Sequence, residues 1–322
     1  MIFEKKVLGI YKKTLLTRND PDGTVFYFGK EDFPALSCND YVFFGDKGQK
    51  LSAHIYFKNE KRTDRIVMFE HGMGNGGHTA YMREINLLCE HGYTVFTYDH
   101  TGTRDSEGEN IGGFSQSLAD LDKAVGFVRS MPEYEKADIS VVGHSWGGFS
   151  TMNITALHPE IKHAVAISGF ISPRAIQSQV LGGILKFYRK AIFRSEKDAF
   201  PTYADTDARE SLKGTKTKVL IIHSRDDKVC RFENHFGELE KVHGTNENVE
   251  FLAVDGKGHN PNYTVDALKY KDEFFAALTE KKKKGELATD EAKAEFVGSF
   301  DWYKMTEQDM SVWDKILAFL EK

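Results

Sequence analysis

A single serine stands between two glycines at the end of an apolar run, in the stretch VVGHSWGGFS (residues 141–150). Ser145 occupies the centre of a G-x-S-x-G pattern whose glycines are Gly143 and Gly147. The residues before it favour a buried strand and those after it favour a helix, so the pattern predicts a sharp strand-to-helix turn. Such a turn strains the backbone of the serine and leaves no room for side chains at the flanking positions. Glycine fits these positions because it has no side chain. The stretch therefore predicts a nucleophilic serine.

A serine hydroxyl is a weak nucleophile at neutral pH, so it requires a histidine base, and that histidine requires an acid to hold its tautomer. Both follow further along the chain, in loops that come after two apolar, strand-like segments. The loop RDDKV supplies Asp226 or Asp227, and the loop DGKGHN supplies His259. Since ligands bind at the carboxyl ends of the strands in doubly wound sheets, we predict that these side chains meet Ser145 at that edge.

Apolar runs of strand length alternate with longer segments that carry apolar residues at helical spacing, which predicts an α/β fold. We expect a mostly parallel central sheet with helices on both faces. The expected strands are residues 50–57, 65–72, 93–99, 139–145, 163–168, 218–224 and 248–256. The expected helices lie near residues 79–90, 115–130, 146–157, 231–243 and 262–280. The N-terminal 40 residues are expected to form a turn and edge strands that join the sheet antiparallel.

Two segments interrupt this alternation. Residues 172–215 separate two good strand candidates and are predicted to form a small helical cap. This cap would be inserted after the sixth core strand, and the core would consist of residues 1–171 and 216–322. The second segment is a charged C-terminal extension, about residues 281–322, which is expected to end in a short apolar helix capped by Thr306.

The cap segment carries apolar residues at roughly helical intervals, among them Ile176, Val180, Ile184 and Phe187. These side chains are candidates for a substrate pocket under a lid. The alternative is that they only pack the cap onto the core, because a cap helix must bury one face in any case.

The chain resembles the α/β-hydrolases over about residues 40–280, and it is most similar to the monoacylglycerol lipase-like and serine aminopeptidase-like (hydrolase-4) esterases. Five landmarks carry the resemblance in order: FEHGMGNGGH, YDHTGTRDSEG, GHSWGG, HSRDDKV and GKGHN. The resemblance implies the α/β-hydrolase fold. It also implies that the acid is the fourth residue after His223, which is Asp227. The backbone N–H groups of Met73 and Trp146 would form the oxyanion hole.

One landmark departs from the family pattern. Relatives usually have D-x-x-G-x-G-x-S in the second landmark, and Arg104 stands here at the second glycine. Arg104 is either a surface residue or a contact to an anionic part of the substrate.

The resemblance implies a serine hydrolase that cleaves carboxylic esters through an acyl-enzyme intermediate, with short, medium or aromatic acyl groups. Three alternatives remain open: a serine aminopeptidase-like peptidase, an acyltransferase, and a non-catalytic ligand-binding receptor on a hydrolase scaffold. A peptidase would need an anchor for the amino group of its substrate, and the acidic candidates are Glu70, Asp105, Glu107 and Asp205.

Composition narrows the cellular setting. The net charge of -5 gives no reason to expect a nucleic-acid partner, and the expected partner is a small-molecule ester. The three cysteines do not have the spacing of metal ligands, and we expect neither a metal nor another cofactor. Because the cysteines cannot all pair within one chain, we also expect a cytoplasmic location. No apolar run of membrane-spanning length is present, and the oligomeric state stays open.

Overall fold

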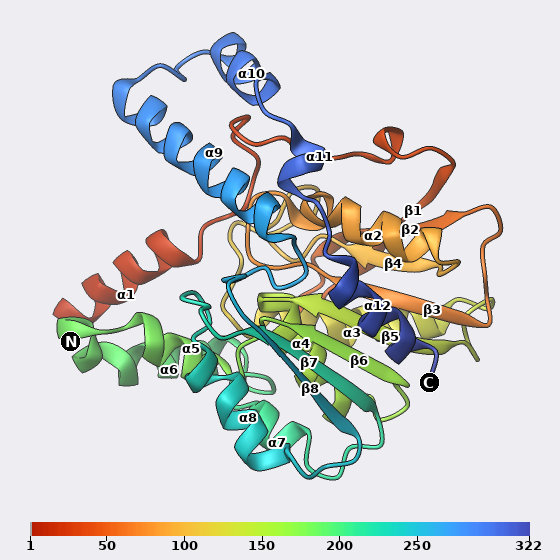
Figure 1. The fold of residues 1–322 in the computed structure, drawn as a ribbon. Coiled ribbons are helices and arrows are strands. Elements are labelled where there is room, and N and C mark those ends of the chain that lie inside the picture. Colours follow the sequence, from red (N-terminus) through yellow and green to blue (C-terminus); the bar gives the residue numbers. More distant parts are fainter. Residues whose placement is uncertain (1) are drawn as a thin grey trace.

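The computed structural model describes residues 2–322, apart from the side chains of residues 2–4, 184 and 185. A mixed sheet forms its centre (Figure 1), and eight strands belong to this sheet within the described chain, in the order β1-β2-β4-β3-β5-β6-β7-β8. The strands are β1 (Leu36–Phe44), β2 (Lys50–Lys58), β3 (Arg65–Glu70), β4 (Val95–Tyr98), β5 (Asp138–His144), β6 (His163–Ile167), β7 (Lys218–Ser224) and β8 (Val249–Val254). Strands β3 to β8 run parallel, whereas β1 and β2 join antiparallel at one edge.

Strands β3 to β7 are buried on both faces of the sheet, which explains why they are largely apolar. Along β3, Ile66 and Met68 face the core cluster beneath α3 (Gln116–Ser130), and Val67 and Phe69 face the opposite cluster. That opposite face is covered by α2 (Met82–Glu90) and by the C-terminal α12 (Met310–Leu320). The predicted mostly parallel sheet between two helical layers is confirmed.

Residues 172–215 are helical in the structure. They form α5 (Pro173–Val180), the 3₁₀ helix η4 (Gly183–Tyr188), α6 (Arg189–Ala199) and α7 (Ala208–Ser211). Whether they act as a separate cap stays a prediction.

The N-terminal prediction was partly wrong. Residues Ile2–Leu15 form helix α1, and the strand that joins the sheet edge is β1, which begins only at Leu36. Leu8 and Tyr11 lie three positions apart on one face of this helix and pack against the core. The Tyr11 hydroxyl also accepts a hydrogen bond from Gln177 Nε2 in α5 at 3.3 Å. Helical spacing therefore docks α1 beside the cap segment, where Figure 1 places it.

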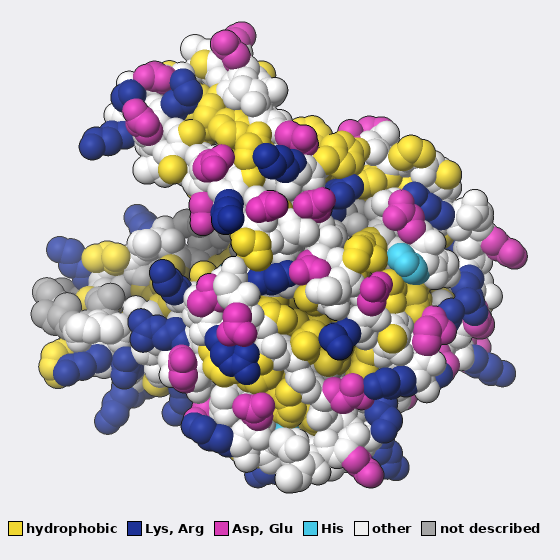
Figure 2. All heavy atoms as spheres, in the orientation of Figure 1, with side chains coloured by type: hydrophobic (Ala, Val, Ile, Leu, Met, Phe, Trp, Pro, Cys, Tyr) yellow, Lys and Arg dark blue, Asp and Glu magenta, His cyan; other side chains and the backbone are white. Residues whose placement is uncertain are grey.

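The C-terminal region is part of the packed body and not a loose tail. Helix α9 (Val265–Lys284) ends on four consecutive lysines, which suit the negative end of the helix dipole. Together with α10 (Asp290–Gly298) it forms an arm, and apolar side chains fill the contact between the two helices (Figure 2). The short α11 (Trp302–Met305) then leads into α12.

The cap of the last helix differs from the prediction. The side chain of Asp309 accepts the Ser311 amide at the start of α12, whereas the Thr306 hydroxyl donates to the carbonyl of Trp302. Asp309 stands directly before the first helical residue and Thr306 does not, so only the aspartate can reach the free amides. Among the described helices, none combines the length and apolarity that crossing a bilayer requires.

Candidate active site

Ser145 lies in the turn between β5 and α4 (Trp146–Asn153), with φ 57° and ψ −110°. Two close backbone approaches explain the flanking glycines. A Cβ at Gly143 would lie 2.4 Å from the carbonyl oxygen of Gly147, and a Cβ at Gly147 would lie 2.2 Å from that of Glu70. The Ser145 amide donates to the carbonyl of Ile167 in the neighbouring strand at 2.8 Å. The turn is therefore locked between strands and holds the serine in a strained conformation.

Three predicted side chains meet at the carboxyl edge of the sheet. His259 Nε2 lies 2.8 Å from Ser145 Oγ, and His259 Nδ1 lies 2.8 Å from Asp227 Oδ2. The imidazole is then an acceptor for the serine hydroxyl and a donor to the carboxylate, which is the tautomer that a general base requires. The Asp227 side chain is fully buried, and 18% of the His259 side chain is exposed.

Asp227 is held as a carboxylate by several donors. Its Oδ1 accepts the amides of Val229 and Cys230 at 2.8 and 3.0 Å, and His223 Nε2 lies 3.1 Å from its Oδ2. Burial alone would raise the pKa of Asp227, but the hydrogen bonds from His223 and His259 outweigh burial and lower the pKa well below its ordinary value. The carboxylate thus stays charged beside His259.

The neighbouring Asp226 has a different role. Its Oδ1 accepts the backbone amides of Lys257 and Gly258 at 3.2 and 3.1 Å, and the Ser224 hydroxyl at 2.5 Å. These contacts fix the loop before His259 without touching its imidazole. Of the two aspartates left open by the residue pattern, the structure places Asp227 against His259.

The two segments expected to supply an oxyanion hole, the loop at Gly72 and the start of α4, both approach Ser145. Trp146 is the first residue of α4, so its N–H has no partner within the helix and points out of its N-terminus. Gly72 lies against the nucleophile, since a Cβ on it would come 3.3 Å from Ser145 Cβ. Met73 follows Gly72 directly, and 37% of its side chain is exposed.

A hydrogen-bonded bridge connects this loop to the base. The Gly72 amide donates to the Tyr81 hydroxyl at 3.1 Å, which donates to His144 Nδ1 at 2.8 Å. His144 Nε2 donates to the carbonyl oxygen of His259 at 2.7 Å. Burial and the neighbouring His259 lower the pKa of His144 to about 3, so His144 is neutral and bridges both partners. Sequence reasoning did not single out Tyr81, because no local pattern links it to the serine.

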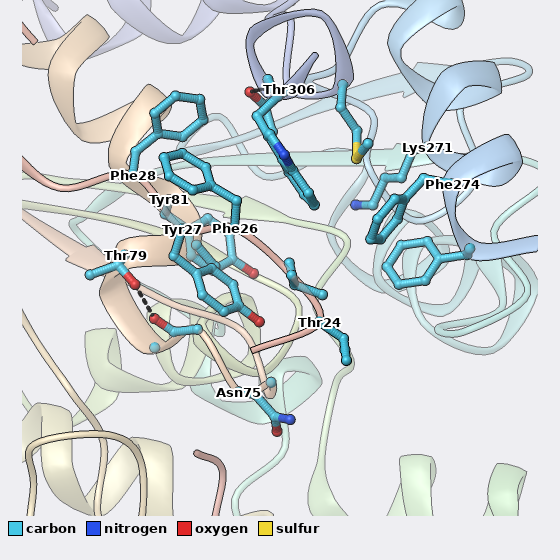
Figure 3. A pocket seen from close by; sticks show the side chains of 18 of the residues that line it. Thr24, Phe26, Tyr27, Phe28, Asn75, Thr79, Tyr81, Lys271, Phe274 and Thr306 are labelled. Atoms are coloured by element: carbon cyan, nitrogen blue, oxygen red, sulfur yellow. Dashed lines mark hydrogen bonds between the residues drawn. The ribbon is translucent and has the colours of Figure 1, made fainter. Parts of the chain in front are cut away.

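A cavity of about 450 Å³ opens beside the Gly72–Met73 loop (Figure 3). Its walls come from the segment before β1, from the glycine-rich loop after β3, and from α9 and α11. The aromatic residues that line it are Phe26, Tyr27, Phe28, Tyr81, Tyr263, Phe274, Phe275 and Trp302. The charged ones are Asp22, Lys271 and Lys282. Because none of its lining residues belongs to the cap segment, the cavity was not expected from the sequence.

The cap residues proposed as substrate contacts lie elsewhere. Ile176 is 4% exposed and belongs to the hydrophobic core, whereas Val180 and Phe187 are 44% and 74% exposed. These three residues are not among those that line the cavity. The side chain of Ile184 lies outside the described part of the chain. A role for these four residues in substrate binding stays a prediction.

Arg104 adopts the backbone conformation that a glycine would favour, with φ 44°. Its Nε lies 4.0 Å from Asp99 Oδ2 inside the protein. A cation at this position therefore compensates a buried carboxylate, and the loop keeps its turn despite the missing glycine.

Two groups of side chains away from the triad have the spacing of metal ligands within the described residues. One consists of Cys38, Asp40 and His54, and the other of His54, His78 and Asp99. Their members already bond to one another, with His54 Nδ1 2.8 Å from Asp40 and His78 Nδ1 2.9 Å from Asp99. Both groups stand apart from Ser145.

Comparisons with known proteins bear on the fold of this chain. Residues 61–211 match the family model described as serine aminopeptidase, S33. That stretch includes Ser145 and the glycine-rich loop but ends before Asp227 and His259. An uncharacterized protein of Acanthamoeba polyphaga mimivirus is 22% identical over 261 residues, which cover 74% of this chain and 86% of the relative.

Solved structures extend the likeness to the whole sheet. An esterase from Pyrococcus furiosus matches with a TM-score of 0.58 at 22% identity, covering 82% of this chain and 98% of the esterase. An acetyl xylan esterase from Paenibacillus matches with a TM-score of 0.57 at 17% identity, covering 80% of this chain and 88% of that enzyme. At these identities the likeness concerns the fold. By its sheet order, its strand-to-helix turn and these similarities, the chain has the α/β-hydrolase fold.

Proposed function

We propose that this protein is a serine hydrolase that cleaves carboxylic esters through an acyl-enzyme intermediate. The observation that carries the proposal is the continuous hydrogen-bonded chain from Ser145 Oγ through His259 to Asp227, with both links at 2.8 Å. Such a chain activates a hydroxyl that would otherwise be a poor nucleophile.

The reaction follows from the roles that these positions support. His259 Nε2 takes the proton of Ser145 as the hydroxyl oxygen attacks the ester carbonyl, and the amides of Met73 and Trp146 stabilise the negative oxygen. His259 then protonates the departing alcohol, which leaves the acyl group on Ser145. A water molecule, deprotonated by His259, releases the acid and regenerates the serine. Asp227 stabilises the imidazolium that forms in each half of the cycle.

The surroundings of the site favour an ester over a peptide with a free amino terminus. Such a peptide needs an acidic anchor, yet none of the four acidic candidates lines the cavity; Glu70 is buried and accepts the Tyr98 hydroxyl, and Asp205 pairs with Lys197. The cavity beside the oxyanion loop presents the amine of Lys271, which repels an ammonium group. Among the structural neighbours, the two described above are named as esterases, which supports the same choice.

The experiment is a comparison of esters and amides on purified protein. A ladder of p-nitrophenyl esters from acetate to palmitate, together with aminoacyl p-nitroanilides, is assayed with the wild type and with Ser145→Ala. The proposal predicts ester turnover with a maximum at one acyl length, lost in Ser145→Ala. Faster turnover of the anilides would support the peptidase, and Ser145-independent turnover would overturn the proposal. Acyl transfer to an added alcohol in preference to water would identify an acyltransferase. Thermal stabilisation by a ligand without turnover would identify a receptor.

A further inference from the structure

The cavity beside the glycine-rich loop adjoins the proposed catalytic centre through Gly72. Gly72 and Met73 line it, and Gly72 also lies against Ser145. A substrate whose carbonyl reaches the Met73 amide can therefore place an adjoining group in this cavity. Its volume of about 450 Å³ is within the usual range for small-molecule sites.

Aromatic rings dominate the wall opposite this loop. Phe274 packs edge to face against Trp302, with ring centroids 4.9 Å apart, and Phe26 lies 5.9 Å from the same indole. These rings are fixed by their contacts with one another, so they offer a preformed surface for another ring. The wall therefore favours a flat aromatic group over a flexible chain.

The side chain of Lys271 points into this aromatic cavity. The amine of Lys271 points from α9 toward the cavity beside Phe274 (Figure 3). Lys271 Nζ donates to Asn260 Oδ1 at 3.1 Å and lies 5.1 Å from the centre of the Tyr263 ring. Asn260 follows His259 in the chain, so the amine is tethered one residue from the proposed base.

The charge of Lys271 lacks a direct partner. Among the described residues, no carboxylate oxygen lies within 4.0 Å of its Nζ. By contrast, Lys282, the other cavity lysine, pairs with Asp22 at 2.9 Å. Burial lowers the pKa of Lys271, with the negative charge of Glu84 opposing that effect. Burial also raises the pKa of Glu84 to about 7. Glu84 lies beyond ion-pair distance of Lys271 and accepts a hydrogen bond from Asn262. It therefore supplies only a partial countercharge.

A partly buried ammonium without an ion pair is costly unless an anion joins it. We propose that this cavity binds an aromatic group of the ester substrate that carries an anionic substituent, and that Lys271 pairs with that anion. The inference rests on the proposed esterase function and adds the substrate class. The anion is a carboxylate or a group of similar charge, and the ring lies among Phe26, Phe274 and Trp302.

The test compares matched esters that differ in one para substituent, a carboxylate or a methyl group. One pair places the charge in the alcohol part, as 4-carboxyphenyl acetate against 4-methylphenyl acetate. The other places it in the acyl part, as monomethyl terephthalate against methyl 4-methylbenzoate. Wild type, Lys271→Met and Lys269→Met are assayed for kcat/KM. Lys269 is an exposed lysine on the same helix, so its loss removes an equal charge away from the cavity.

We expect the wild type to prefer the anionic member of at least one pair by tenfold or more. Lys271→Met should lower kcat/KM for that ester at least tenfold more than for its neutral partner, whereas Lys269→Met should keep the wild-type ratio. A ratio near one in both pairs, or an equal loss on both members in Lys271→Met, would overturn the inference. Ser145-dependent hydrolysis without charge preference would leave the esterase function standing.

A binding measurement tests the anion site separately from the esterase function when turnover is absent. Calorimetry with monomethyl terephthalate uses Ser145→Ala, which cannot hydrolyse the ester. Binding that weakens at least tenfold in Ser145→Ala/Lys271→Met supports the anion site even if the esterase proposal fails. The same titration with 4-carboxyphenyl acetate covers a charge in the alcohol part. Binding of both esters that is undetectable, or equal in the two variants, contradicts the anion site whatever the activity of the wild type.

Discussion

The ring of His144 donates a hydrogen bond from Nε2 to the carbonyl oxygen of His259, over 2.7 Å. The residue before the proposed nucleophile thus holds the backbone of the proposed base. Its other ring nitrogen accepts the hydroxyl of Tyr81, which in turn accepts the amide of Gly72. One chain of hydrogen bonds therefore connects the histidine loop, the serine turn and the loop that carries Met73.

The bridge through Tyr81 is expected to position catalytic groups without touching the substrate. Tyr81→Phe removes the hydroxyl that connects Gly72 to His144, so both loops lose a fixed spacing. We predict a fall in kcat of about 10- to 100-fold, with KM much less affected, because small misplacements of reacting groups cost roughly 10²-fold.

Steady-state kinetics on the wild type and Tyr81→Phe checks this, with Tyr134→Phe as the matched control. The Tyr134 hydroxyl is buried and has no hydrogen-bond partner among the described residues. Its removal should leave kcat within twofold. An unchanged kcat in Tyr81→Phe would remove the positioning role.

The two adjacent aspartates provide a second test. Asp227→Asn keeps the shape of the side chain but cannot hold the imidazole in the productive tautomer, so we expect kcat to fall about 10⁴-fold. Asp226→Asn affects the contacts to the Lys257 and Gly258 amides and to the Ser224 hydroxyl but not the imidazole, and the loss should stay below tenfold. Ester hydrolysis by both purified variants decides between them. The reverse order of activities would assign the acid to Asp226.

The turn at Ser145 requires glycine for steric reasons. Gly147→Ala would place a methyl group 2.2 Å from the carbonyl oxygen of Glu70, a backbone atom that cannot move aside easily. We expect a loss of about 1–3 kcal/mol in the free energy of unfolding, together with lower activity. Gly126→Ala in α3 is the control, because nothing lies within 4 Å of its new methyl group. Chemical denaturation should show that this control is neutral or slightly stabilised. Equal stabilities of the two variants would contradict the steric account.

Buried Glu84 predicts a pH-dependent stability. Burial raises its pKa from the ordinary 4.5 to about 7 in the folded protein. Between these values the folded state holds a proton that the unfolded state has lost, so stability falls as the pH rises toward 7. Glu84→Gln stays neutral throughout. Its stability relative to the wild type should therefore rise by up to about 3 kcal/mol between pH 4.5 and 8, since each pKa unit is worth about 1.4 kcal/mol.

Urea unfolding at pH 5 and pH 8 measures this difference. Glu90→Gln, at the partly exposed end of the same helix, is the control. Hydrogen bonds from Lys58 and Asn86 outweigh burial and lower the pKa of Glu90. Glu90 therefore titrates at or below its ordinary value of 4.5 in both states, so its substitution should change relative stability little between pH 5 and pH 8. A Glu84→Gln difference that is the same at both pH values would show that Glu84 titrates normally.

The serine turn and its partners could be predicted because short-range rules govern them. Gly143 and Gly147 are required by a steric constraint that is local in the sequence. The parallel sheet brings the loops of Asp227 and His259 to the same edge. The alternation of apolar residues also placed the central strands within a few positions of their observed ends.

The cavity could not be predicted in this way. Its wall combines Phe26, Met73 and Phe274, which are far apart in the chain and are brought together only by the packing of α9 and α11 on the glycine-rich loop. The apolar spacing of the cap segment, by contrast, is local and can be read directly from the sequence. Ile176 nevertheless packs in the core, while the charged C-terminal extension supplies Lys282, Trp302 and Met305 to one side of the cavity.

The central claim is that His259 activates Ser145 as a nucleophile, and covalent labelling tests it most directly. Wild type, Ser145→Ala and His259→Ala are treated with a fluorophosphonate, and the adduct is located by peptide mass spectrometry. The account predicts one adduct on Ser145 in the wild type, none on that peptide in Ser145→Ala, and labelling slowed by at least about 10³-fold in His259→Ala. An adduct on another residue, or labelling of Ser145 at the same rate without His259, would contradict it.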